Sequence, residues 1–126
     1  MQDEYILQPA QPITEDLREK MRAWLRSELP VLAIEQPDDL WYLFSDPGAR
    51  EVVTRRLEEE PQTPMYAYAV IRIRSSHIHL GTVRDPETDR GLYEFARWVQ
   101  EQGEFALSDS GMPIEVAELI DPELYE

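Results

Sequence analysis

Helical periodicity is clearest in residues 15–28. The apolar side chains of this stretch fall on one face of an α-helix; they are Leu17, Met21, Trp24 and Leu25. Thr14 is a favourable N-cap, and Pro30 prevents continuation because its ring clashes with the preceding turn. The pattern predicts an amphipathic helix over about residues 15–28.

A second helix is predicted over about residues 89–102. Its apolar stripe consists of Leu92, Phe95, Ala96 and Val99, with Trp98 beside it. Two N-terminal caps fit the sequence, either Asp85-Pro86 or Asp89, and Gly103 supplies the C-terminal stop.

A third helix is predicted over about residues 47–59, because Asp46 is a capping residue and Pro47 is favoured at the first helical position. We expect this helix to face the core with four apolar side chains, Ala49, Val52, Val53 and Leu57. The helix ends in three glutamates (58–60), whose charges oppose the negative end of the helix dipole. Fraying or a cationic partner would relieve this cost.

Residues 65–74 and 77–83 alternate between apolar and polar side chains and are rich in strand formers. The two serines between them predict a β-hairpin. Its register places on one apolar face the pairs Ile73–Ile78, Ile71–Leu80 and Ala69–Thr82. The opposite face then carries Arg74–His77, Arg72–His79, Val70–Gly81 and Tyr68–Val83, with Tyr66 further along.

Four shorter segments are also predicted to be strands, namely residues 5–7, 31–35, 105–108 and 114–118. Residues 40–44 are five consecutive apolar residues, which fit either a buried strand or a helical turn. Their short length and the capping residue Asp38 favour the helical turn. Together the elements predict an α+β domain of two layers, with three main helices on one face of a mostly antiparallel sheet around the central hairpin.

The composition describes an acidic globular protein. The chain has 126 residues, which we expect to form one domain (residues 1–126), and 42% are hydrophobic, too many for a disordered acidic tail. Its 26 acidic and 12 basic residues give a net charge of −14. A negative field of this size repels phosphate backbones and attracts cations. We therefore expect a basic protein partner and no direct nucleic-acid binding.

Cysteine is absent, which excludes disulfides and thiolate sites and fits a reducing compartment. No apolar run is long enough to cross a bilayer, and residues 1–4 lack the basic region of a signal peptide. We expect a cytoplasmic protein with no membrane association.

Acidic residues concentrate toward both ends of the sequence. Residues 98–126 contain eight carboxylates, residues 1–17 contain four, and neither segment has a basic residue. Domain termini often lie close together, so we expect one acidic region that binds the partner. A solubilising surface would produce the same pattern. The candidate residues are Glu101, Glu104, Asp109, Glu115, Glu118 and Asp121.

The polar face of the hairpin is a second candidate binding surface, composed of Tyr66, Tyr68, Arg72, Arg74, His77 and His79. Tyrosine and arginine are enriched at interface hot spots. Two guanidinium groups at alternate strand positions could also hold a carboxylate or phosphate. The same arginines could instead pair with carboxylates of the chain itself.

His77 and His79 share a strand face, a spacing that occurs in metal-binding strands. A metal site would need further ligands, and the predicted register places Arg72 and Arg74 opposite, where they would oppose a bound cation. We therefore predict no metal and no cofactor. The sequence also lacks a glycine-rich phosphate loop and a serine triad, so no catalytic residue is assigned and an enzyme is less expected than a binding protein.

Three functions fit these observations. The favoured one is a small acidic module that engages a basic macromolecule, as an inhibitor of the immunity or antitoxin type or as a secretion chaperone. The second is a small-molecule or anion binder, or an enzyme, that uses the hairpin face. The third is a structural domain that oligomerises with copies of itself.

Overall fold

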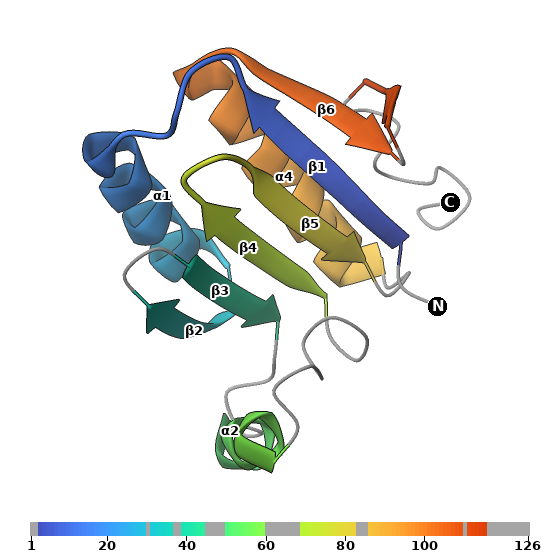
Figure 1. Cartoon of the computed structure of the whole chain (residues 1–126). Helices are drawn as coiled ribbons and strands as arrows, with labels where there is room; N and C mark the ends of the chain where they lie inside the picture. The colour runs from blue at the N-terminus through green and yellow to red at the C-terminus, as the bar shows by residue number, and fades with distance from the viewer. Residues whose placement is uncertain are drawn as a thin grey trace.

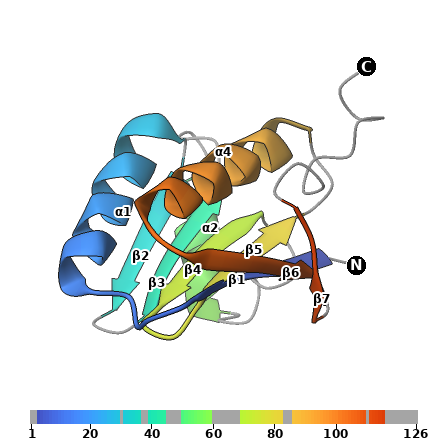
Figure 2. The same ribbon diagram turned by 90° about the horizontal axis from the view of Figure 1, so that it is seen from above.

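The computed structural model describes residues 3–29, 31–36, 39–44, 50–59, 69–82, 86–109 and 111–115. These residues form an α+β domain in which helices cover one side of an antiparallel seven-stranded sheet, as Figure 1 and Figure 2 show. The predicted class, α+β with a mostly antiparallel sheet, is confirmed.

The strands are β1 (Asp3–Pro9), β2 (Val31–Gln36), β3 (Asp39–Phe44), β4 (Val70–Arg74), β5 (Ile78–Thr82), β6 (Phe105–Asp109) and β7 (Met112–Pro113). The helices in the described residues are α1 (Glu15–Glu28), α2 (Arg50–Glu59) and α4 (Pro86–Gln102). The strand order is β2-β3-β4-β5-β1-β6-β7. Strand β1, the first along the chain, therefore lies inside the sheet between β5 and β6.

Helix α1 forms where the sequence predicts it. The Thr14 side chain accepts a hydrogen bond from the Leu17 amide (3.2 Å), which satisfies one of the amides left open at the helix start. Met21 and Leu25 are fully buried on the face toward the sheet.

Helix α4 starts earlier than predicted, with Pro86 as its first residue. Asp89 is therefore not its N-cap, and that alternative is wrong. The Asp89 carboxylate lies inside the first turn, is buried, and accepts a hydrogen bond from the Thr82 hydroxyl on β5. The interaction ties the start of α4 to the sheet, because a buried carboxylate must keep its hydrogen bonds.

The expectation of three main helices is corrected. The layer on the sheet consists of two helices, α1 and α4, whereas α2 lies beyond the ends of β3 and β4, apart from that layer (Figure 1). The reason is the connection: β3 and β4 are adjacent antiparallel strands, so the chain between them need not cross a face of the sheet. The predicted start at Asp46-Pro47 lies outside the described residues.

Residues 40–44 form a strand, so the favoured helical turn is wrong. Strand β3 pairs with β2 on one side and with β4 on the other. Leu40, Tyr42 and Phe44 are buried in the core beneath the helices, and Leu43 is buried on the opposite face. A strand that is covered on both faces has a continuous apolar sequence, which removes the alternation that would identify it.

The central hairpin has the predicted register. Arg72 pairs with His79, Ile73 with Ile78 and Ile71 with Leu80. The described strands are shorter than predicted, residues 70–74 and 78–82, and residues 65–68 lie outside the described residues.

The last predicted strand, residues 114–118, is displaced. The chain turns at Gly111, whose φ of 84° suits glycine, and β7 is the two-residue strand Met112–Pro113. Ile114 and Glu115 follow without strand structure, and residues 116–118 lie outside the described residues.

Three aromatic rings join the two helices over the sheet. Trp24 of α1 lies 5.7 Å from Phe95 and 5.5 Å from Trp98 of α4, measured between ring centroids. Phe95 is fully buried, and Trp98 is only partly buried. The helical layer thus has an aromatic centre, with Phe95 pointing into the core.

Candidate functional site

The hairpin residues Arg72, Arg74, His77 and His79 lie on the sheet face opposite the helices. Their neighbours along β4 and β5, among them Ile71 and Ile78, are fully buried in the core beneath α1 and α4. Alternation along a strand then turns the four polar side chains the other way. The structure therefore brings these predicted residues together, whereas Tyr66 and Tyr68 lie outside the described residues.

Arg72 is held by two side chains of β3. Its Nε and Nη2 atoms donate hydrogen bonds to the Asp39 carboxylate at 2.8 and 2.6 Å, and its guanidinium lies 4.1 Å from the centre of the Trp41 ring. Partial burial raises the pKa of Asp39, but the hydrogen bonds from Arg72 and Trp41 and the charges of Arg72 and Arg74 together outweigh it, so the pKa is lowered. Asp39 and Trp41 thus occupy two of the five N–H donors of Arg72 and one face of its guanidinium plane.

The imidazoles of His77 and His79 are adjacent, with ring centroids 4.6 Å apart. Nδ1 of His77 lies 2.8 Å from the Ser76 hydroxyl. Burial lowers the pKa of His77, and the charge of Arg74 lowers it further. Burial also lowers the pKa of His79, followed by the effect of His77, while Glu4 opposes the change. Both rings are therefore expected to be neutral at pH 7.

Neutral imidazoles can bind a metal, but this face lacks the remaining ligands. Within the described ranges, no three histidine, aspartate or glutamate side chains are placed to hold an ion together. The nearest carboxylate on β3, Asp39, is committed to Arg72. On the hairpin face, the Arg72 side chain thus contacts Asp39 and Trp41 of β3, whereas Nδ1 of His79 is buried without a hydrogen-bond partner among the described residues.

The histidine pair predicts a pH effect on stability. Because both pKa values are lowered in the folded protein, the unfolded chain takes up protons first as the pH falls below the ordinary value of 6.5. We expect urea denaturation to show a lower free energy of unfolding at pH 5.5 than at pH 7.5. The histidine contribution should stay below about 1 kcal/mol, since both rings are partly exposed and water screens their charges.

The His77→Gln/His79→Gln variant is the comparison for that experiment, because carboxylates also titrate at acid pH. Its free energy of unfolding should fall less between pH 7.5 and 5.5 than that of the unmodified protein. Equal changes in the two proteins would show that the pair contributes nothing to the pH dependence.

The four described residues of the predicted acidic surface do not form one cluster. Glu101 and Glu104 are exposed at the end of α4 and just before β6. Asp109 ends β6 and Glu115 follows β7, at the other end of that strand. Glu118 and Asp121 lie outside the described residues. The described members of the predicted set are thus divided between the two ends of β6.

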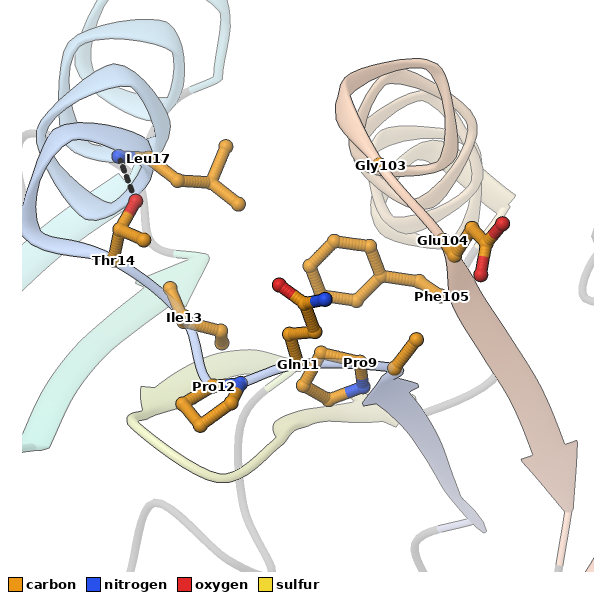
Figure 3. A pocket seen from close by; sticks show the side chains of 10 residues that line it. Pro9, Gln11, Pro12, Ile13, Thr14, Leu17, Gly103, Glu104 and Phe105 are labelled. Atoms are coloured by element: carbon orange, nitrogen blue, oxygen red, sulfur yellow. Dashed lines mark hydrogen bonds between the residues drawn. The ribbon is translucent and has the colours of Figure 1, made fainter.

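A cleft opens beside Glu104, where β1 leads into α1 and α4 leads into β6. Its volume is about 350 Å³. It is lined by Pro9, Ala10, Gln11, Pro12, Ile13, Thr14, Leu17, Gly103, Glu104 and Phe105. In Figure 3, Leu17 of α1 and the Phe105 ring of β6 face each other across the cavity, and Glu104 points away from it.

Hydrogen bonds at both ends of the connecting loop fix the floor of the cleft. The Ala10 amide donates to the Glu104 carbonyl at 3.0 Å, and the Ile13 amide donates to the Ser75 carbonyl at 3.1 Å. On the other wall, the Gln100 side-chain amide donates to the Phe105 carbonyl at 3.1 Å. The cleft is therefore part of the framework of the fold. A second, more open hollow shares five lining residues with it, namely Pro9, Ala10, Gly103, Glu104 and Phe105.

Four exposed carboxylates lie on the segments that build this cleft. Glu15 and Asp16 are exposed between the lining residues Thr14 and Leu17, and Glu101 lies two positions before Gly103. The last turn of α4 contains no basic residue, so its negative dipole end adds to the same field. Arg18, the basic residue that follows Leu17 on α1, is buried. We call Glu15, Asp16, Glu101 and Glu104 the acidic rim.

Sequence reasoning found the acidic rim only in part, and it missed the cleft. Pro9 and Pro12 lie between the predicted strand 5–7 and the predicted helix 15–28, where their fixed φ angles stiffen the connecting loop. Phe105 belongs to a predicted strand, and nothing in its spacing indicates that the ring reaches toward α1.

No family model, curated protein or solved structure matches the chain. Among the described residues, no helix has the length and apolar character needed to span a membrane. The function is therefore inferred from the chemistry of the site itself.

Proposed function

We propose that the chain is a binding module for a basic protein, and that the acidic rim is its contact surface. The observation that carries this proposal is that four exposed carboxylates lie on the two segments that build a preformed cleft. Residues 3–17 and 98–109 contain no basic residue, and the nearest ones along the two helices are Arg18 and Lys20 on α1 and Arg97 on α4. An inhibitor of the immunity or antitoxin type and a secretion chaperone are two classes that would use such a surface.

Electrostatics supports a cationic partner over a neutral one. Glu101 lies at the C-terminal end of α4, where its negative charge is repelled by the negative end of the helix dipole. A cation bound at the rim would relieve this repulsion. The net charge of −14 adds long-range attraction, which accelerates association and makes it sensitive to salt. A cytoplasmic location fits this role and stays a prediction.

The hairpin face supports an anion-binding function less well. Two donors of Arg72 already bind Asp39, and Trp41 covers its plane. An anion that used the same two donors would have to displace the Asp39 carboxylate. Oligomerisation through Tyr66 and Tyr68 involves positions outside the described residues, and no contact in the described part of the chain favours it.

The test is a pull-down from native lysate with washes at low and then high salt. We expect the unmodified protein to retain a basic protein at low salt and to release it at high salt. The Glu101→Gln/Glu104→Gln variant should lose most of this retention. The matched control is Glu58→Gln/Glu59→Gln, which removes the same charge from exposed positions on α2 and should retain the partner.

Two results would contradict the proposal. One is an eluate without a basic protein at low salt. The other is equal loss of retention in the two variants, which would mean that total charge matters and that the rim has no special part.

A further inference from the structure

We propose that the cleft between α1 and β6 binds one large apolar side chain, preferably aromatic, from a partner segment in which basic residues flank it. This inference rests on the proposed function and adds to it the chemistry of the residue that anchors the partner. The acidic rim would then receive the flanking cations. Interfaces commonly combine a buried apolar anchor with a charged surround.

The size of the cleft favours a single side chain. Its volume of about 350 Å³ lies at the lower end of the range for ligand pockets. That space suits one aromatic side chain with its adjoining backbone better than a large cofactor. The floor is held by the backbone hydrogen bonds of Ala10 and Ile13, so binding would require little ordering of the loop.

The walls favour an apolar group over a charged one. Leu17 and Phe105 provide facing apolar surfaces, and the buried Ile13 lies between them and the hairpin turn. Gln11 is the neutral polar side chain that reaches into the space, while the Glu104 carboxylate points outward (Figure 3). A charged side chain would lose hydration inside without gaining an opposite charge.

An anion at the start of α1 is the obvious competitor, and the local chemistry disfavours it. The Thr14 hydroxyl already accepts the hydrogen bond of the Leu17 amide. Glu15 and Asp16 occupy the first turn and would repel a second negative charge. The same two carboxylates attract a lysine or arginine next to the anchor, so the charge of the rim and the polarity of the walls point to one kind of segment.

The experiment compares two synthetic peptides, Lys-Arg-Trp-Arg-Lys and Lys-Arg-Ala-Arg-Lys, by NMR titration of the full chain at about 20 mM salt. We expect the tryptophan peptide to bind about tenfold more tightly than the alanine peptide. Its largest amide shifts should fall at Leu17 and Phe105. Equal affinity of the two peptides would overturn the inference.

Two further variants test whether the cleft is the cause of the preference for the tryptophan peptide. Gln11→Phe fills the space from an exposed position, so the advantage of the tryptophan peptide should disappear while weak binding of both peptides persists. Gln102→Phe makes the same change at an exposed position that does not line the cleft, and should keep the tenfold difference. If Gln11→Phe keeps it as well, the tryptophan binds elsewhere.

The charge variant separates this inference from the function on which it rests. Glu101→Gln/Glu104→Gln should weaken both peptides by a similar factor. If the two peptides bind equally and this variant weakens both, the acidic rim stands and the anchor site fails. If the variant changes neither affinity, the proposed function fails too.

Discussion

Replacing Phe95 by alanine should lower the free energy of unfolding by about 3–5 kcal/mol. Phe95 is fully buried on α4 and has Trp24 and Trp98 as aromatic neighbours at 5.7 and 6.3 Å. Removing the ring leaves a cavity where the two helices meet the sheet, and the rings around it cannot close the space without leaving their own contacts. Urea denaturation at pH 7.5 measures the loss.

Trp98→Ala is the matched control, because it removes a larger ring of the same cluster from a partly exposed position. It should cost about 1 kcal/mol. A similar cost for the two variants would mean that the cluster is a surface contact and that the helical layer packs on the sheet by other residues.

The second large effect is expected at Asp39. Replacing Asp39 by alanine should lower the free energy of unfolding by about 2 kcal/mol, because it leaves the partly buried Arg72 guanidinium without its two hydrogen bonds. Only 19% of the Arg72 side chain and 20% of the Asp39 side chain are exposed, so water replaces the lost contact poorly. The pKa of Asp39 lies below its ordinary value of 3.8, so this stabilisation is present above that pH and is lost as the pH falls further.

A double-mutant cycle with Arg72→Met isolates the pair. If the interaction is as described, the double variant should be more stable than the sum of the single losses implies. Arg74→Met removes the exposed arginine of the same strand and should change stability by less than about 0.5 kcal/mol. Additive losses in the cycle would show that Asp39 and Arg72 act independently.

The parts of the fold that the sequence predicts well are those with a one-sided pattern. Helix α1 has an apolar stripe, a cap and a proline stop, and its observed bounds agree with the prediction. The hairpin register follows from the alternation of β4 and β5, because a shift by one residue would turn Ile71 and Leu80 away from the core. Such patterns specify both the element and the face it buries.

Strand β3 could not be identified in the same way, since both its faces are covered. Predicting residues 40–44 as a helical turn also hid the partners of Arg72, because Asp39 and Trp41 lie on β3. In the predicted hairpin alone, Arg72 has no partner on a neighbouring strand, so its face is a candidate ligand site. The cleft could not be predicted either, because Leu17 and Phe105 are far apart in the sequence. Only the strand order brings them to opposite walls of one cleft.

The interior position of β1 has a consequence for how the chain reaches this structure. Tyr5 pairs with Leu80 on one side and with Asp109 on the other, so the strand made first finds its neighbours only after most of the chain has left the ribosome. Until then the apolar residues of β1 have no neighbouring strand to pair with. Pairing β1 with β5 and β6 closes long loops of chain, which slows folding. The hairpin of β4 and β5 is local by comparison and can form early. We therefore expect the last step of folding to be the insertion of β1 between β5 and β6, and that same step builds the floor of the cleft.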